Sequence, residues 1–104
     1  MQRSLFAIVV SSFLLSMHQV VVADDMDAFV EACLSATNIE RPMCECTARK
    51  AKQELSPKGF DFVVAVLRQD EAVTAKLRAE MTVQETMKAG TFMTRGPMQC
   101  AQEG

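Results

Sequence analysis

The sequence has no tryptophan, no tyrosine and a single histidine, His18, and it has only four glycines. His18 lies in an N-terminal apolar stretch that we predict to be removed, so the remaining chain has no imidazole. Nucleophilic sites of the Ser/His/Asp and Cys/His kinds need that group as a base, and zinc and copper sites use it most often as a ligand. The scattered glycines form no phosphate-binding loop. We therefore predict no enzyme activity, no metal site and no cofactor.

Residues 1–23 have the three parts of a secretory signal peptide. Arg3 gives a short positive start, and residues 5–17 form an apolar core interrupted by serines. Val21 and Ala23 occupy the small-residue positions of a cleavage site before Asp24. The core of about 13 residues is shorter than the ~20 that span a bilayer, although an uncleaved anchor ending at Ala23 is the alternative. We therefore predict a periplasmic or secreted protein with no stable membrane insertion after cleavage.

Residues 24–104 form one small domain after cleavage. Removing 23 residues from 104 leaves 81, and only Arg3 is lost among the charged side chains, so 10 basic and 13 acidic residues remain. The resulting net charge of −3 is opposite in sign to the basic excess of nucleic-acid-binding proteins. We expect no nucleic-acid partner, whereas a protein partner is compatible with this composition.

Apolar spacing and capping residues predict five short helices. The first helix is expected from Asp24 to about Thr37, and the second from residue 43 to 55, after Pro42. The third, fourth and fifth helices are expected to begin at the caps Ser56-Pro57, Asp70 and Thr82-Val83-Gln84-Glu85. The fifth is expected to end before Gly96-Pro97, because proline breaks helices, which leaves Cys100 in a short tail. The expected apolar stripes are Met26, Phe29, Val30 and Cys33; Cys44, Ala48, Ala51 and Leu55; Val73, Leu77 and Met81; and Val83, Met87, Phe92 and Met93.

The continuous apolar run of residues 60–67 could be a buried strand. No other segment has a strand pattern that would pair with it, so a helix buried on most sides is favoured. The predicted fold is all-α, a compact bundle of five short helices held by two disulfides.

The four cysteines, Cys33, Cys44, Cys46 and Cys100, are expected to form two disulfides, as is usual in small exported domains. A Cys44–Cys46 bond would close a strained ring, and on a helix these side chains point ~200° apart. The remaining pairings are Cys33–Cys46 with Cys44–Cys100, or Cys33–Cys44 with Cys46–Cys100. Cys33 and Cys46 are equally distant from the middle of the turn at residues 38–41, so we slightly favour the first pairing.

The sequence Cys44-Glu45-Cys46 is also a candidate redox dithiol, because a helix N-terminus lowers the pKa of a thiol. No thioredoxin-like βαβ pattern surrounds it, and the spacing differs from the usual C-x-x-C. Structural disulfides are therefore the main interpretation, and thiol–disulfide or soft-metal handling through Cys44 and Cys46 is the alternative.

Three further features have ordinary structural explanations. Six methionines could bind Cu(I), but there is no histidine or tight cluster beside them: Met26, Met43, Met81, Met87, Met93 and Met98. Of these, Met26, Met81, Met87 and Met93 lie on the expected helical stripes and are better explained as core residues. Four basic residues could form an anion or partner site, but such groups are usually a solvated helix face: Arg41, Arg49, Lys50 and Lys52. Gly90 either marks a close helix crossing or weakens the helix by ~1 kcal/mol.

Several motifs together resemble small exported helical proteins of Gram-negative bacteria that have four cysteines and no assigned function. They are Phe29-x3-Cys33-x10-Cys44-x-Cys46, Leu55-Ser56-Pro57, Ala89-Gly90-x-Phe92-Met93 and Pro97-x2-Cys100-Ala101. The resemblance covers nearly all of residues 24–104 and implies a periplasmic location, but it transfers no binding or catalytic residue. We predict a non-enzymatic binding or accessory protein with an unknown partner.

Overall fold

The computed structural model describes residues 25–103, and all of its regular elements are helices. They are α1 (Asp25–Ala36), α2 (Arg41–Glu54), α3 (Pro57–Leu67), α4 (Glu71–Glu80) and α5 (Val83–Glu103). The predicted all-α fold with two disulfides is confirmed, and residues 60–67 belong to a helix. The predicted leader, residues 1–23, and the cleavage point before Asp24 lie outside the described residues.

Local capping explains where the later helices begin. The Ser56 hydroxyl accepts a hydrogen bond from the Gly59 amide at 3.0 Å, and Pro57 follows it in the first turn of α3. Before α5, the Thr82 hydroxyl accepts from the Glu85 amide at 3.0 Å, and the Glu85 carboxylate accepts from the Thr82 amide at 2.9 Å. The bond from the Thr82 amide holds the pKa of the Glu85 carboxyl below its usual value. The predicted capping box is confirmed.

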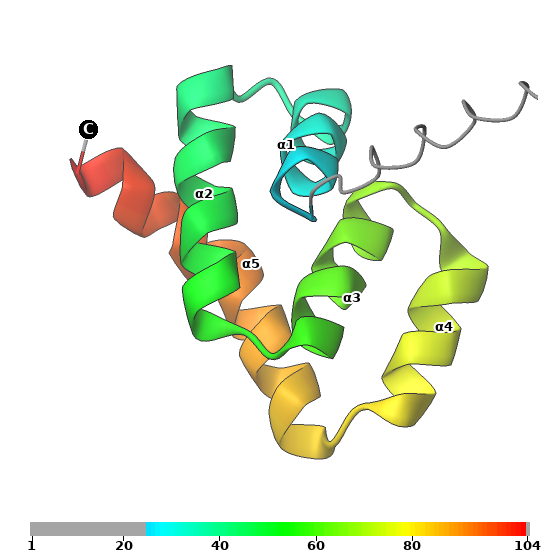
Figure 1. The fold of residues 1–104 in the computed structure, drawn as a ribbon. Helices are drawn as coiled ribbons and strands as arrows, with labels where there is room; N and C mark the ends of the chain where they lie inside the picture. The colour runs from blue at the N-terminus through cyan, green and yellow to red at the C-terminus, as the bar shows by residue number, and fades with distance from the viewer. Residues whose placement is uncertain (1–24, 104) are drawn as a thin grey trace, which may run out of the picture.

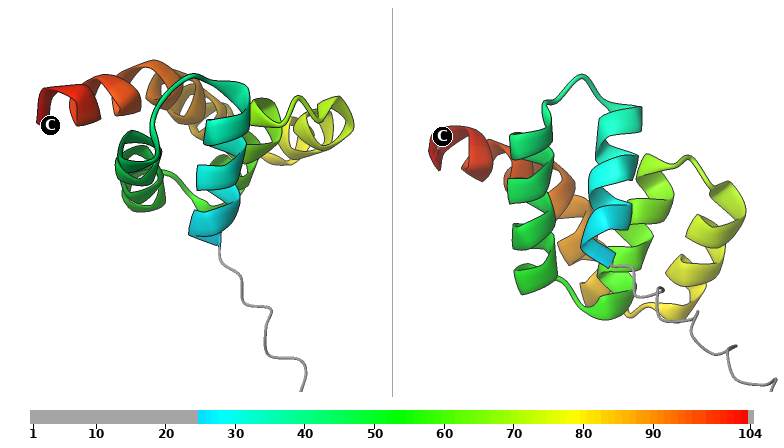
Figure 2. Two further views of the ribbon diagram at one scale, coloured as in Figure 1. Left: turned by 90° about the horizontal axis from the view of Figure 1, so that it is seen from above. Right: turned by 45° about the horizontal axis from the view of Figure 1, so that its top comes forward.

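The helices surround one core, and α4 lies at its edge. α1 and α2 form an antiparallel hairpin, and α3 contacts α1 (Figure 1). α5 runs along the side of α2 and α3 that faces away from α1, and it contacts both helices (Figure 2). α4 runs back along α3, which supplies its main contacts. Helices from the two ends of the described residues, α1 and α5, therefore both pack on α2 and α3.

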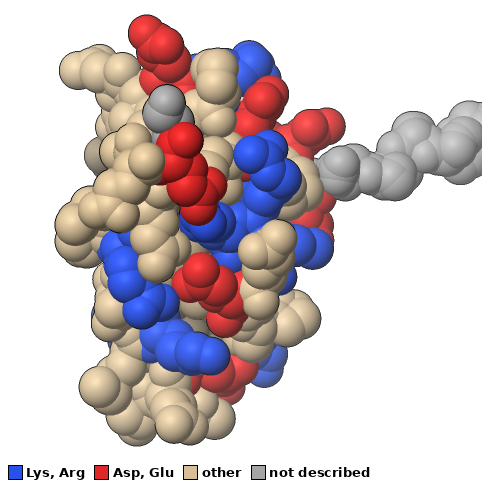
Figure 3. All heavy atoms as spheres, turned by 90° about the vertical axis from the view of Figure 1, so that its left-hand side faces the viewer, with Lys and Arg blue, Asp and Glu red and all other residues tan. Residues whose placement is uncertain are grey.

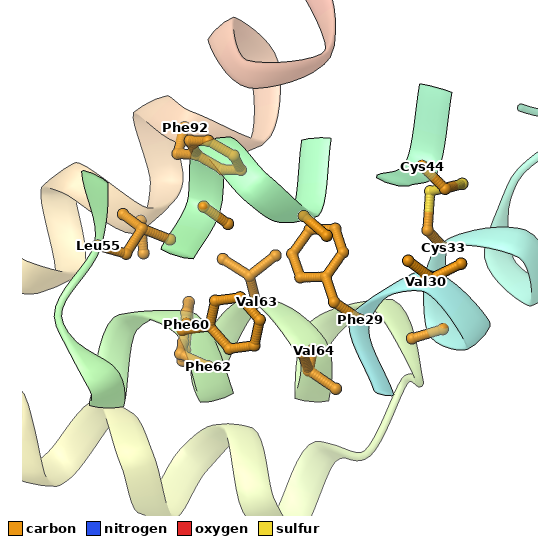
Figure 4. Close-up of a cluster of buried hydrophobic side chains, with 14 of the residues drawn as sticks. Phe29, Val30, Cys33, Cys44, Leu55, Phe60, Phe62, Val63, Val64 and Phe92 are labelled. Atoms are coloured by element: carbon orange, nitrogen blue, oxygen red, sulfur yellow. A yellow bond between two sulfur atoms is a disulfide. The ribbon is translucent and has the colours of Figure 1, made fainter. Parts of the chain in front are cut away.

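Three large side chains form the centre of the core, Phe29 of α1, Val63 of α3 and Phe92 of α5 (Figure 4). The Phe29 ring also contacts the Phe60 ring, with centroids 5.4 Å apart in a tilted arrangement. Because these residues come from three helices, their burial fixes the helices relative to one another.

The predicted apolar stripe of the fourth helix is wrong in part. Among the residues of α4, none is buried, and Val73 is 41% exposed. Leu77 is half-buried, and Met81 is buried but lies in the turn after the helix. Apolar spacing alone does not set the depth of burial, because a helix that packs on one neighbour leaves part of its apolar face in water.

The predicted end of the fifth helix is also wrong, since α5 continues through Pro97 to Glu103. A proline inside a helix removes one backbone hydrogen bond and usually destabilises it. Here the segment beyond Pro97 is held from outside by the Cys46–Cys100 bond and by an ion pair of 2.7 Å between Lys50 and Glu103. Cys100 therefore lies on a helix and not in a tail.

The favoured cysteine pairing is wrong: the disulfides are Cys33–Cys44 and Cys46–Cys100, with Cα–Cα distances of 5.8 and 6.0 Å. Equal distance from the turn did not decide the pairing, because side-chain direction matters more. Cys33 and Cys44 are both buried where α1 packs on α2. Cys46 lies ~200° around α2 from Cys44 and meets α5, whose continuation past Pro97 brings Cys100 within reach.

Candidate functional site

The two disulfides differ in exposure. Cys33 and Cys44 are almost completely buried, whereas Cys46 is half-buried beside the Glu103 carboxylate. Each sulfur of the Cys44-Glu45-Cys46 sequence is bonded to a different partner, and no cysteine of residues 25–103 is free. Thiol chemistry at this sequence would first require that one of these bonds be reduced.

The methionines that suggested a soft-metal site are spread over several environments. Met81 is buried, Met93 is half-buried, and Met87 and Met98 are 65% and 53% exposed. Within residues 25–103, no group of three or more cysteine, aspartate or glutamate side chains is arranged to hold a metal ion.

The predicted basic group is a solvated face with balanced charge. Three of its members form ion pairs, Arg41 with Glu31 at 3.6 Å, Lys50 with Glu103 at 2.7 Å and Lys52 with Asp25 at 2.8 Å. Figure 3 shows basic and acidic side chains interspersed on one face of the molecule. Arg49 is exposed near the Cys46–Cys100 bond. These residues do not form a concentrated positive patch.

Gly90 does not mark a close helix crossing, because a Cβ atom placed on it would meet nothing within 4 Å. Gly96 is the glycine that a close contact requires, and the sequence interpretation missed it; the contact is with Phe92 of the same helix and is not a helix crossing. A Cβ atom on Gly96 would lie 2.5 Å from Cζ of Phe92, whose ring is buried. Its position one turn after a large aromatic residue was the available signal.

One face of α5 carries exposed apolar side chains. Val83 and Met87 lie one turn apart and are 77% and 65% exposed. Met87 borders a shallow surface groove together with Leu55 and Lys88. These two side chains were expected in the core, and their exposure shows that the buried stripe of α5 is a different one: Ala89, Phe92, Gly96 and Cys100.

An apolar pocket of about 260 Å³ lies between α1, α3 and α5. Its deep wall is formed by Phe29, Val63 and Phe92, the same side chains that centre the core (Figure 4). Leu67 and Met93 are half-buried and lie nearer to solvent. Of the concave regions in residues 25–103, this one has the lining closest to that of a small-molecule site.

The two threonine hydroxyls at the edge of this pocket are already hydrogen-bonded within the protein. The Thr37 hydroxyl donates to the Cys33 carbonyl at 2.7 Å and accepts from the Ile39 amide at 3.1 Å. The Thr47 hydroxyl donates to the Met43 carbonyl at 2.9 Å. No charged side chain lines the pocket. Its chemistry is therefore that of an apolar binding site and not of a catalytic one.

The sequence interpretation did not foresee this pocket. Cys33, Phe92 and Met93 were identified individually, but as core or disulfide residues. The pocket forms only when α1, α3 and α5 meet, and Pro97 borders it because α5 continues as a helix. No local sequence signal reports such a meeting of distant segments.

Comparisons with protein-family models, with curated proteins and with solved structures give no match to this chain. Among the described helices, none is both long and apolar enough to cross a membrane. The two disulfides are typical of an oxidising, extracytoplasmic compartment.

Proposed function

We propose that this protein is an exported, non-enzymatic helical module that binds a ligand or partner in the periplasm or outside the cell. The apolar pocket between α1, α3 and α5 carries the proposal, because it is a concave site within a covalently linked domain. The two disulfides and the predicted leader, residues 1–23, support export. The likeness to small exported four-cysteine proteins agrees with this location.

The test begins with the full-length chain expressed with its own leader in a Gram-negative host. Intact mass measured under non-reducing conditions, with and without thiol alkylation, is expected to show cleavage before Asp24. It should also show a mass four protons below that of the reduced chain and no alkylated thiol. A cytoplasmic product, or a chain that keeps residues 1–23, would contradict export.

Binding is then tested by native mass spectrometry of the same exported protein, purified without denaturant. The expected result is a defined bound molecule or protein partner that a pocket-filling variant, Met93→Trp, no longer retains. Met98→Trp is the matched control, because Met98 is exposed on the same helix and does not line the pocket.

Thiol–disulfide or soft-metal handling through Cys44 and Cys46 is the second candidate. The observation that favours it is the partial exposure of Cys46; since Cys33, Cys44 and Cys100 are all buried, this makes the Cys46–Cys100 bond the more accessible of the two. Two alkylated thiols in the exported protein, or a mixture of oxidation states, would support this candidate and count against purely structural disulfides.

A further inference from the structure

We propose that the apolar pocket binds one uncharged aromatic small molecule. The inference rests on the proposed function, because it names the ligand class of the same site. It follows from four features of the pocket: its bonded threonine hydroxyls and lack of charged side chains, the aromatic and sulfur character of its wall, its volume, and the way in which its walls are held.

The polar groups of the pocket favour an uncharged ligand. The hydroxyls of Thr37 and Thr47 are bonded to backbone groups, and no ionisable side chain lines the site. A charged or strongly hydrogen-bonding ligand would lose its bonds to water on entry and would find no charged partner and few hydrogen-bonding partners in return. A ligand made mainly of apolar surface would not have this cost.

The wall of the pocket favours an aromatic ring. Phe29 and Phe92, from two different helices, line the buried side of the pocket, and Met93 adds a thioether at the more exposed side. Aromatic rings pack on one another edge-to-face or offset, with an energy beyond that of simple burial. Sulfur also makes favourable contacts at ring edges. A ring placed among these three side chains can make both kinds of contact.

The volume of the pocket is suited to a one- or two-ring molecule. An engineered apolar cavity of about 150 Å³ in another protein binds benzene, and this pocket has about 260 Å³. Water in the pocket finds few hydrogen-bonding partners, because both threonine hydroxyls are used. Displacement of that water by an apolar ligand is therefore favourable.

The walls are fixed before a ligand arrives. The Cys33–Cys44 disulfide links the α1 wall to α2, and Cys33 itself lines the pocket. On α5, Gly96 leaves the space in which the Phe92 ring lies, since any Cβ at that position would collide with the ring. A preformed site does not have to be ordered by its ligand, which favours affinity for a small molecule.

The experiment titrates the oxidised, exported protein with 2-naphthol, which is uncharged at neutral pH and has two fused rings. The wild-type protein has no tryptophan or tyrosine, so the fluorescence of 2-naphthol can be followed with little protein background. The tryptophan variants are titrated with excitation at wavelengths longer than those at which tryptophan absorbs. We expect saturable binding at one molecule per chain. Met93→Trp should weaken binding at least tenfold by filling the pocket, whereas Met98→Trp should leave it unchanged.

A second measurement keeps the test independent of how well Met93→Trp folds. In the wild-type protein, the methyl resonance of Met93 should shift on titration because of the ring current of the ligand, while that of Met98 should not. Leu67→Trp provides a second pocket-filling variant from α3. Circular dichroism and melting temperature establish that each variant is folded.

The outcomes separate the ligand class from the proposed function. Absence of saturable binding, equal loss in the Met93→Trp and Met98→Trp variants, or preferential binding of 1-octanol would overturn the aromatic assignment. If native mass spectra still show a bound molecule or partner in such a case, the binding function stands with a different ligand. If neither 2-naphthol nor any native molecule binds, both proposals fail.

Discussion

Helices α2 and α3 are neighbours in sequence but are held in the fold by different means. α2 buries only small or sulfur-containing side chains and one hydroxyl: Cys44, Thr47, Ala48 and Ala51. α3 buries two phenylalanines and two valines among its six buried residues: Gly59, Phe60, Phe62, Val63, Val64 and Ala65. Each disulfide has one end on α2, and neither has an end on α3.

Of these two neighbouring helices, the covalent links therefore lie on the one that buries less apolar surface. Burial of a phenylalanine or valine side chain contributes about 1.5–3 kcal/mol, and burial of an alanine contributes much less. α2 also places small residues against α1 and α5, which lets these helices approach closely. In a domain of this size, disulfide bonds and apolar burial complement each other, because the small core buries only a limited apolar area.

The largest expected effect on the free energy of unfolding comes from removing the disulfides that hold α2. Cys46→Ala with Cys100→Ala should lower the free energy of unfolding by about 4 kcal/mol in the chain-entropy model, since the bond closes a loop with a sequence separation of 54. For Cys33→Ala with Cys44→Ala, at a separation of 11, the model gives about 3 kcal/mol.

Denaturant titration measures both losses, and reduction of the wild-type protein is the control. Together they are comparable with the whole stability of a small domain, ~5–15 kcal/mol, so the yield of exported protein should also fall sharply. Unchanged midpoints in both double variants would show that the fold does not depend on its disulfides.

The apolar half of the comparison is tested by Val63→Ala in α3. Val63 is 2% exposed, and its truncation removes two carbons from the centre of the core. The free energy of unfolding is expected to fall by about 2 kcal/mol, because each buried carbon that is removed costs ~0.8 kcal/mol and the cavity left behind adds to this. Ala75→Gly, on an exposed position of α4, is a control that should cost only the helix propensity of ~1 kcal/mol. If denaturant titration gives the same loss of unfolding free energy for Val63→Ala and Ala75→Gly, α3 is not the centre of the apolar core.

Gly96→Ala tests the packing of the buried Phe92 ring, which lies over Gly96 within α5. The new Cβ would lie within 2.5 Å of Cζ of the buried Phe92, so the ring must move, which should cost about 1–2 kcal/mol after the gain in helix propensity. Gly90→Ala is the matched control, because its Cβ meets open space and should stabilise the helix by up to ~1 kcal/mol. The same sign of change in both variants would refute this explanation of Gly96.

Gln69→Gly should stabilise the turn between α3 and α4 by about 1 kcal/mol. Gln69 has a φ of 59°, and the turn is a Schellman motif in which the Asp70 amide donates to the Ala65 carbonyl and the Gln69 amide to the Val66 carbonyl. Glycine adopts this left-handed conformation without the strain of a side chain. The melting temperature of Gln69→Gly is compared with that of Gln69→Ala. The alanine variant keeps the strain of a side chain, so its melting temperature should not rise.

The features that could be predicted from sequence are those set by nearby residues. The caps at Ser56 and Asp70 and the box at Thr82 and Glu85 were predicted because each bond joins residues three apart. The disulfide pairing and the apolar pocket depend on how helices rotate against one another. That rotation is decided by packing across the whole core, and no local pattern contains it.

The charges around Lys52, where α1, α2 and α3 meet, provide the smallest predicted effect. Lys52 forms an ion pair of 2.8 Å with Asp25, and its ammonium lies 5.2 Å from the centroid of the Phe60 ring. Burial raises the pKa of the Asp61 carboxyl above its usual value, and the Asp25 carboxylate adds to this, while Lys52 opposes it. A raised pKa means that the folded state holds the proton of Asp61 more tightly than the unfolded state does.

The charged form of Asp61 is therefore a cost to stability at neutral pH, and Asp61→Asn should raise the melting temperature there slightly. The gain should fade as the pH falls from the raised folded pKa to below the ordinary value of 3.8, because both states are then protonated. Asp27→Asn is a control of opposite sign, since it removes a favourable charge from the first turn of α1. If the rise in melting temperature of Asp61→Asn persists unchanged at pH 3, the substitution acts through packing. The charge of Asp61 on α3 and that of Lys52 on α2 would then have no measurable part in holding the two helices together.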